Sequence, residues 1–527
     1  MIYTMAMLNR ITLSACCILL ALLGKSQTNT KDTVPVRNSK QIVHVIKADI
    51  FRRIKQDSAK DLNLLVGNVE LRQNNTTFYC DSAIQDNELN QFEAFGNIHI
   101  NDADSVHTYS QYLKYIGDTR IANLKTKVKM TDGKGVLTTE NLEYDLNAKL
   151  GTYLDGGKVV NGKSVLTSKE GYYYADTKDV YFQKNVRLVD PEYTLASDTL
   201  LYNVNSEVAS FVAATTIRDA KSRIRTRSGY YDLKKGKANF TNRPIMDDST
   251  QFVIADKINY DKISGEGIAE GNVIYTDTTQ GVAMLSGAAV FNNQKKDILS
   301  YKHPVMILKQ DNDSLFIAAD SFYSAYHNRD TSKKADRSDT MRYFNAFHHV
   351  RIFSDSLQGK CDSLFYSTID SIFRFFVDPI IWTKGSQVSG DTLLLTTKNK
   401  KVDQFFANEN AFSINEAQVG LYNQLKGNNM SGTFIDGTLD FIKAKGNGES
   451  LYYLQDQDSA YVGMDYTQAD AIIFKFIQKE LKRVTWINSA TGTTYPFKKI
   501  PADKRELRNF RWLEAIRPKN AGELFAY

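Results

Sequence analysis

Residues 195–202 read Leu-Ala-Ser-Asp-Thr-Leu-Leu-Tyr, the fullest copy of a motif that recurs along the chain. Its closing tyrosine belongs to a series with a constant step of 29 residues: Tyr115, Tyr144, Tyr173, Tyr202, Tyr231 and Tyr260. Nine residues after each lies a second position, held by Leu124, Tyr153, Phe182, Phe211, Phe240 and Ala269. A fixed period of this length is the signature of a repeat architecture. We therefore expect about thirteen such units between residues 43 and 497.

The residues within the motif alternate in character. In an extended strand, Leu200 and Tyr202 point to one face, whereas Thr199 and Leu201 point to the other. In other copies that second face carries Lys114, Glu143 or Asn259. One apolar and one mixed face predict an antiparallel sheet with one wet side. A single unit cannot bury its apolar face alone, so we expect stacked units in an elongated all-β solenoid.

The second half of each unit contains Gly-Asn-Val or a variant of it. Copies are Gly67-Asn68-Val69, Gly96-Asn97-Ile98, Asn185-Val186 and Gly271-Asn272-Val273. Proline takes the Asn place at Pro244, Pro304 and Pro379, which a strand start or a turn tolerates and a helix does not. This pattern predicts a strand start or a turn. An aspartate also recurs in the first half of the motif, and we expect it to hydrogen-bond at turns or edges and not to bind Ca²⁺. Its copies are Asp81, Asp198, Asp256, Asp320, Asp362 and Asp391.

The regions outside the clear repeats have other characters. Residues 1–27 resemble a signal peptide cleaved near Gln27, although Cys16 sits in a sequence resembling a lipoprotein box, which leaves lipidation open. Residues 327–341 are polar and predict an inserted surface loop. The motif weakens over residues 421–497. We expect residues 498–527 to form a basic, partly helical tail that caps the open end.

Charge and cysteine content exclude some classes. The net charge is +6; residues 1–27 hold two cations and no acid, and residues 498–527 hold eight Lys/Arg and four Asp/Glu, so the body between them is neutral. A nucleic-acid-binding face would need a basic surface, so we expect no nucleic-acid partner. Cys80 and Cys361 lie many units apart, beyond the reach of a disulfide, and are predicted to be buried free thiols.

The recurring Gly-Asn-Val and Ala-Asp-x-Leu-x-Tyr elements behind a signal peptide resemble the LptA/OstA (organic solvent tolerance) family of lipopolysaccharide-transport proteins. The resemblance covers residues 43–420 and is clearest at Gly67 to Val69, Leu195 to Tyr202 and Ile254 to Tyr260. It implies a β-jellyroll or β-taco with an apolar groove, a periplasmic location that leaves association with the outer membrane open, and binding of lipopolysaccharide through lipid A. It also implies two partners joined by β-strand augmentation, an inner-membrane extractor complex and an outer-membrane LptD-like barrel. The length leaves open whether two or more family domains are stacked.

The candidate lipid-binding residues are the apolar ladder positions that would line such a groove. They are Leu113, Tyr115, Leu142, Tyr144, Tyr173, Phe182, Leu200, Tyr202, Phe211, Tyr231, Phe240, Ile258 and Tyr260. The same ladder could simply fill a solid core. Motifs for nucleophilic, metal or phosphate chemistry are missing from the sequence, so we expect no enzyme, cofactor or metal. The alternatives are a structural or adhesive β-repeat protein and, less favoured, a polysaccharide-active β-helix enzyme.

Overall fold

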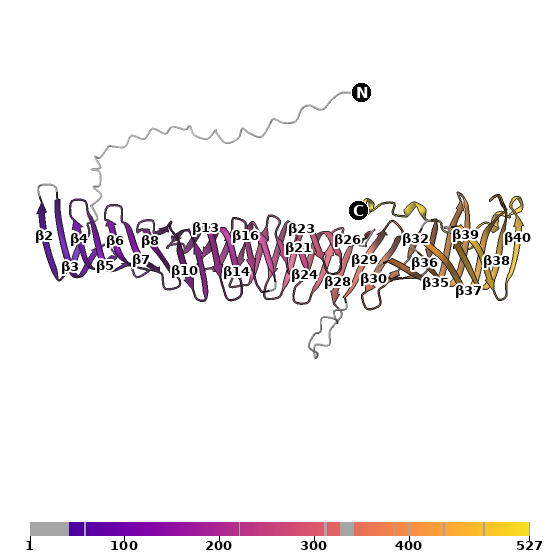
Figure 1. Cartoon of the computed structure of the whole chain (residues 1–527), viewed down its shortest axis with the longest axis horizontal. Helices are drawn as coiled ribbons and strands as arrows, with labels where there is room; N and C mark the ends of the chain where they lie inside the picture. Colours follow the sequence, from indigo (N-terminus) through magenta and orange to yellow (C-terminus); the bar gives the residue numbers. More distant parts are fainter. Residues whose placement is uncertain are drawn as a thin grey trace, which may run out of the picture.

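The chain forms a long rod built from one sheet (Figure 1). The computed structural model describes residues 42–56, 60–220, 222–309, 314–326, 342–383, 385–398, 401–435, 438–477 and 480–525. These residues form one antiparallel sheet of 40 strands, with short helical turns only in the tail. The expected elongated all-β repeat fold is therefore confirmed. The predicted signal peptide, Cys16 and the loop 327–341 lie outside the described residues.

The strands run along the rod in chain order. The first part contains β1 (His44–Lys47), β2 (Ile50–Gln56), β3 (Lys60–Gln73), β4 (Thr76–Asp86), β5 (Gln91–Asp102), β6 (Val106–Ile116), β7 (Ile121–Thr131), β8 (Val136–Asp145), β9 (Leu150–Tyr153), β10 (Gly157–Asn161), β11 (Ser164–Ser168), β12 (Glu170–Tyr174) and β13 (Asp179–Val189). The middle contains β14 (Thr194–Asn203), β15 (Val208–Phe211), β16 (Thr215–Arg218), β17 (Arg223–Thr226), β18 (Ser228–Asp232), β19 (Lys237–Thr241), β20 (Ile245–Asp247), β21 (Gln251–Ile254), β22 (Lys257–Asp261), β23 (Glu266–Asp277), β24 (Val282–Asn292), β25 (Asp297–Tyr301), β26 (Val305–Lys309), β27 (Ser314–Ala318) and β28 (Ser321–Tyr326). The last part contains β29 (Arg342–Phe353), β30 (Gln358–Ser367), β31 (Ile372–Phe376), β32 (Ile380–Thr383), β33 (Ser386–Ser389), β34 (Thr392–Lys398), β35 (Lys401–Gln418), β36 (Leu421–Ile435), β37 (Thr438–Gln455), β38 (Tyr461–Ile477), β39 (Glu480–Ile487) and β40 (Thr491–Pro496).

The sheet is folded lengthwise into two walls. Strand β14, for example, pairs with β15 along its second half and with β16 along its first half. One wall, here called the Tyr wall, is formed by the strand halves that carry the Asp-x-Leu-x-Tyr motif. The other, here called the Val wall, is formed by the halves that lie beyond the Gly-Asn-Val motif. Apolar side chains from both walls, such as Leu113 and Val128, enter the same core cluster.

The line along which the sheet folds, here called the crease, is a column of β-bulges. In β5, Gly96 and Asn97 have φ of 74° and 44°, and the pairing register with β6 shifts between Phe95 and Ile98. Glycine and asparagine adopt this left-handed conformation most readily. Where the sequence left a strand start or a turn open, the Gly-Asn-Val motif bends a continuous strand and does not connect two strands.

The aspartate ladder fastens this crease. Asn97 Nδ2 donates to Asp81 Oδ2 at 2.9 Å, and Asn272 Nδ2 donates to Asp256 Oδ2 at 2.8 Å. Further along, Asn410 Nδ2 donates to Asp391 Oδ2 at 3.0 Å. Each bond joins the two halves of one unit, so the predicted hydrogen-bonding role of the aspartates is confirmed at these positions. Within the described residues no group of three or more His, Cys, Asp or Glu side chains is arranged to hold a metal ion.

The tail after β40 doubles back along the rod (Figure 1). Its 3-10 turns are Phe497–Lys499, Ala502–Lys504 and Glu514–Ile516, and its single-turn helix is α1 (Gly522–Phe525). Leu507 packs among residues of β35 and β37, whereas Leu524 packs on Val305 and Ala318 of β26 and β27. The tail thus covers the outer face of the Val wall instead of only capping the end as we expected. We call residues 497–525 the strap.

Both cysteines of the described chain are free and buried, as predicted. Burial raises the pKa of the Cys80 thiol and of the Cys361 thiol to about 12. Because the reactive form is the thiolate, both side chains act as small apolar core residues. The described residues also contain no helix with the length and apolar character needed to cross a membrane.

Candidate functional site

Opposite the crease the two walls meet along a line that we call the seam. Tyrosines of the Tyr wall reach across it to polar side chains at the ends of Val-wall strands. The hydroxyl of Tyr144 donates to Asp102 Oδ2 at 2.9 Å, and that of Tyr173 donates to Asp132 Oδ2 at 2.7 Å. The hydroxyl of Tyr115 donates in the same way to Gln73 Oε1. The phased tyrosines therefore fasten the walls together in this part of the rod.

Cations reinforce the same stretch of the seam. Lys149 Nζ lies 2.5 Å from Asp102 Oδ2, and Lys178 Nζ lies 3.4 Å from Asp132 Oδ2. In the preceding unit, Arg120 Nη2 donates to Thr76 Oγ1 at 3.1 Å. These cations are themselves 29 residues apart, and the next members of that series are Glu207, Gly236 and Gly265. This series of cations thus ends after residue 178, and further along the rod Lys262 pairs across the seam with Glu192.

Burial keeps the seam tyrosines neutral, so that they remain donors. It raises the pKa of Tyr115 to about 12. Burial, together with the charge of Asp102, also raises the pKa of Tyr144, and burial together with Asp132 raises the pKa of Tyr173. A phenol that stays protonated can donate a hydrogen bond to a carboxylate throughout the physiological range.

The thirteen predicted groove residues lie in the packed interior and along the seam. Nine of them are buried: Leu113, Tyr115, Leu142, Tyr144, Phe182, Leu200, Phe211, Phe240 and Ile258. The other four, Tyr173, Tyr202, Tyr231 and Tyr260, are half-buried and pack against the core clusters. Tyr173 also borders a small cavity of about 50 Å³ beside Tyr153 and Val159. In this conformation the nine buried side chains present no open surface to a ligand, so their contact with lipid stays a prediction.

The tyrosine series breaks in the middle of the rod. Across the Tyr wall, Tyr260 is followed at the same level by Gly267 and then by Phe291. Phe291 is followed in turn by Ile298 and then by Ser324. The two positions at which the alternation would place the next phenols thus carry a ring without a hydroxyl and a side chain too short to cross the seam.

A cavity of about 530 Å³ opens where the phenols are missing. Strands β23 to β35 supply its walls, and its volume lies within the range typical of ligand sites. The apolar lining includes Val282, Met284, Met306, Leu308, Leu315, Phe344, Ile352, Phe373, Phe375 and Leu395. Polar side chains from the strand ends complete it, including Gln280, Lys309, Ser354, Ser356, Thr368, Ser371, Thr397 and Lys401. The site therefore combines an apolar interior with a rim of hydroxyl-bearing and cationic side chains.

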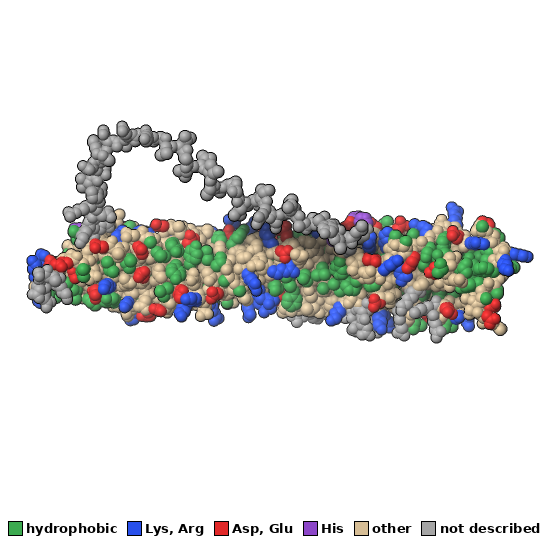
Figure 2. Space-filling view, turned by 90° about the horizontal axis from the view of Figure 1, so that it is seen from above, with side chains coloured by type: hydrophobic (Ala, Val, Ile, Leu, Met, Phe, Trp, Pro, Cys, Tyr) green, Lys and Arg blue, Asp and Glu red, His purple; other side chains and the backbone are tan. Residues whose placement is uncertain are grey.

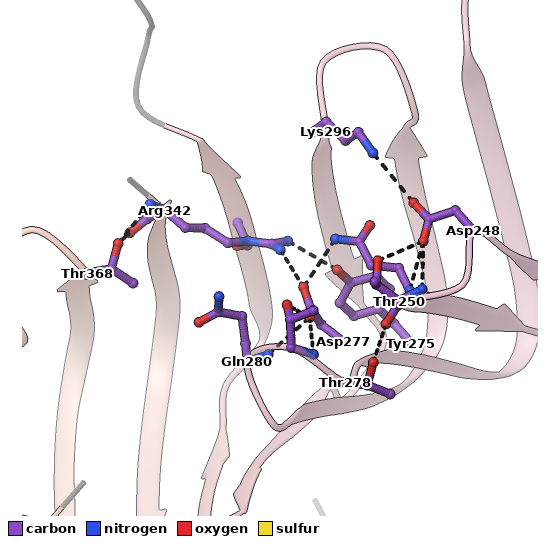
Figure 3. A network of polar contacts seen from close by, with 12 residues as sticks. Asp248, Thr250, Tyr275, Asp277, Thr278, Gln280, Lys296, Arg342 and Thr368 are labelled. Atoms are coloured by element: carbon purple, nitrogen blue, oxygen red, sulfur yellow. Dashed lines mark hydrogen bonds and ion pairs between the residues drawn. The ribbon is translucent and has the colours of Figure 1, made fainter. Parts of the chain in front are cut away.

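Arg342 spans the seam at this cavity (Figure 3). Its Nη1 donates to Asp277 Oδ2 at 3.2 Å and its Nη2 donates to the Tyr275 hydroxyl at 3.3 Å. Its Nε donates to Ser324 Oγ at 2.7 Å, and the guanidinium lies 5.2 Å from the ring centre of Tyr326. Arg342 thus makes with Asp277 the cross-wall contact that tyrosines make nearer the N-terminus.

Acidic turns of the Val wall extend this network. Asp277 Oδ2 also accepts a hydrogen bond from Gln251 Nε2 at 3.1 Å, and its Oδ1 accepts from the backbone N–H of Gln280 at 3.1 Å. In the preceding unit, Asp248 accepts from Thr250 and lies 3.5 Å from Lys296 Nζ (Figure 3). These bonds hold the rim of the cavity in place.

Sequence reasoning missed this site, since none of the thirteen predicted residues lines the large cavity. A signal was present: 29 residues after Tyr260, the series reaches Ala289. The loss of the tyrosine marks where the seam changes, although it does not by itself predict a cavity.

A known protein family matches part of the chain. A family described as OstA-like protein matches residues 40–198. Residues 40–198 form an OstA-like region. This finding confirms the resemblance inferred from the repeated motif. No curated protein matches the chain.

The OstA-like region contains the part of the seam that the tyrosines and cations close. It ends within β14, so the large cavity lies beyond it, in repeats that continue the same sheet. The chain therefore joins a closed OstA-like segment to a central segment with an open interior.

Proposed function

We propose that this protein is a periplasmic lipopolysaccharide-transport component that holds lipid A acyl chains in its interior. The single observation that carries the proposal is the cavity of about 530 Å³ at the interrupted seam, with apolar walls and a polar rim. The OstA-like region supports a transport or binding role over catalysis.

The lining of the cavity suits hydrocarbon. Each methylene that leaves water for an apolar site contributes ~0.8 kcal/mol, so an acyl chain gains affinity with every carbon it inserts. Met284 and Met306 have flexible thioether side chains that adapt to chains of different shape. The rim residues Lys309 and Lys401 would face the polar part of such a lipid.

In this proposal the thirteen candidate lipid-binding residues form a path along which a lipid moves through the rod. Contact between a lipid and Leu142 or Leu200 would require the seam to part, because both side chains are buried. Parting is easier beyond residue 178, where the series of seam cations gives way to Glu207, Gly236 and Gly265, although it would have to break the ion pair of Lys262 with Glu192. Direction would have to come from an external motor, since apolar contacts of similar strength along a path favour neither end.

The ends of the rod suit the expected bridge role. Strand β2 pairs with β3 along one edge, and its side chains Ile50, Phe51 and Ile54 are exposed. An edge strand with exposed apolar side chains is a template for β-strand augmentation. We propose that the inner-membrane extractor complex and the outer-membrane LptD-like barrel join the rod by such strand pairing.

Lipid capture by the purified full-length protein tests the proposal. Native mass spectrometry with added lipid A should detect a complex with the wild-type protein. Met306→Trp, which fills the cavity, should reduce lipid retention at least about tenfold, which corresponds to about 1.4 kcal/mol. Tyr181→Trp, on the outer face, adds the same ring without entering the cavity and should bind as the wild type does.

Two outcomes would contradict the proposal. One is a wild-type protein that retains no lipid A, as a purely structural or adhesive repeat protein would behave. The other is a Met306→Trp variant that folds normally by circular dichroism and still binds lipid at the wild-type level. Leu315→Trp, on the neighbouring strand β27 that also lines the cavity, repeats the test at a second position.

A further inference from the structure

The strap is held against the Val wall by three buried glutamines. Gln387 donates from Nε2 to the Arg511 carbonyl at 2.7 Å and accepts at Oε1 from the Leu513 N–H at 2.9 Å. Gln424 makes the same two-bond contact with the carbonyl of Arg505 at 3.0 Å and the N–H of Leu507 at 2.8 Å. These two clamps bind the strap through its backbone and do not engage the side chains of Arg505 and Arg511.

The third glutamine fixes the path of the strap further along. Gln358 Oε1 accepts from Arg517 Nε at 2.8 Å, and beyond this contact Phe525 packs edge-on against Phe316 with ring centres 6.3 Å apart. The three glutamines are at most 4% exposed. The strap is therefore laid along the rod in a defined position.

The outward side of the strap concentrates the positive charge of the protein. Its exposed cations are Lys498, Lys499, Lys504, Arg505, Arg508, Arg511 and Lys519. The exposed acids of the strap are Asp503, Glu506 and Glu523, and Arg511 Nη2 lies 3.7 Å from the wall residue Asp378. Residues 28–497 have no net charge overall, so the excess of cations on the strap makes its outward surface the basic side of the rod.

Exposed apolar side chains are interspersed among these cations. Phe497, Ile516 and Phe525 are 37%, 46% and 47% exposed. Figure 2 looks onto this side and shows basic, acidic and hydrophobic side chains intermixed along the right half of the face. Cations attract anionic headgroups, and apolar side chains enter the layer between headgroups and acyl chains.

We propose that the strap is a docking surface for an anionic lipid bilayer. The bilayer, and not a soluble acidic polymer, is favoured because Phe497, Ile516 and Phe525 would gain nothing from a purely ionic partner. Docking through the strap would lay the Val wall on the membrane surface. Strands β26 and β27 would then carry the cavity lining on one face and the membrane-bound strap on the other.

Vesicle sedimentation tests this surface with the full-length protein. Binding to vesicles of phosphatidylcholine mixed with phosphatidylglycerol should exceed binding to phosphatidylcholine alone, and it should weaken with salt. The triple variant Arg505→Gln/Arg508→Gln/Arg511→Gln should bind the anionic vesicles about tenfold more weakly or worse. The matched control Lys125→Gln/Lys127→Gln/Lys129→Gln removes three exposed cations from the OstA-like region and should bind as the wild type does.

The apolar contribution has its own variant. Ile516→Ser should weaken vesicle binding several-fold while leaving the charge unchanged, because the glutamine clamps contact other residues. Three results would overturn the proposal: no preference of the wild type for anionic vesicles, equal losses in the two triple variants, or equally tight binding of soluble polyphosphate that Ile516→Ser leaves unaffected. The last result would assign the strap to an acidic polymer.

Discussion

The hydroxyl of Tyr144 donates a hydrogen bond to Oδ2 of Asp102, which lies 42 residues earlier in the chain and on the opposite wall. Both side chains are buried, and Lys149 and Thr76 bind the same carboxylate. This relationship explains why a tyrosine recurs at this level of the wall. Leucine would fill the core as well, but it carries no donor that could bond to Asp102 across the seam.

Loss of that donor should loosen the seam locally. Tyr144→Phe keeps the ring and removes the hydroxyl, which we expect to cost about 1–2 kcal/mol, because the bond is to a charged acceptor that keeps its other partners. Hydrogen exchange of β5 and β8 should rise at this layer. Tyr181→Phe, on the outer face, is the control and should change stability by less than about 0.5 kcal/mol. Equal behaviour of the two variants would remove the seam role from Tyr144.

Acid should open the next layer of the seam. Burial alone would raise the pKa of Asp132. The pKa is nevertheless lowered below its ordinary value of 3.8, because the carboxylate accepts hydrogen bonds from the Tyr173 hydroxyl and from the N–H groups of Lys134 and Gly135. The charge of Lys178 lowers this pKa further. A lowered pKa in the folded state stabilises the fold fully above the ordinary value, and this contribution is lost as the pH falls through the folded-state pKa.

Hydrogen exchange of β12, corrected for intrinsic rates, should therefore rise when the pH drops from about 6 to about 3. In Asp132→Asn this layer should be looser at neutral pH and should respond less to acid, since the titrating group is gone. A wild-type layer that stays equally protected across this range would contradict the assignment.

A charge placed in the core of one repeat should act locally. Leu200 is fully buried, and Leu200→Asp buries a carboxylate without a partner, so strands β13 to β15 should lose protection from exchange. Repeats contact mainly their neighbours, so β36 to β38 should remain protected. Leu201→Asp, one residue later on the outer face, is the control. Uniform loss of protection along the whole rod would show that the array unfolds as one unit.

Much of the fold was predictable because it depends on local periods. The two-residue alternation at Leu200 and Tyr202 identified strands, and the 29-residue step identified stacked layers. The aspartate ladder was also assigned correctly to hydrogen bonding, as Asp81 shows. What the alternation cannot provide is the partner of a side chain across the fold. The bond from Tyr144 to Asp102 on the facing wall was therefore not predicted.

Other features escaped because they arise from departures from the repeat. The cavity opens where Phe291 and Ser324 take the places of tyrosines, and a single missing hydroxyl is a weak signal in a degenerate motif. The strap could not be placed from the sequence, because Gln387 occupies an outward position where a polar side chain is ordinary. Its burial becomes visible only once the tail lies on it.

Arg342 and Asp277 provide the last prediction, because they form the ionic contact across the seam at the cavity. Their side chains are 13% and 2% exposed, so removing one charge leaves the other buried without its partner. We expect Arg342→Met to lower the stability of this segment by about 3 kcal/mol and to raise hydrogen exchange in β23 and β29. The double variant Arg342→Met/Asp277→Asn removes both charges and should recover most of that loss, since neither charge is then stranded. If the double variant is as unstable as the sum of the two single variants, the pair is not coupled and Arg342 does not fasten the seam.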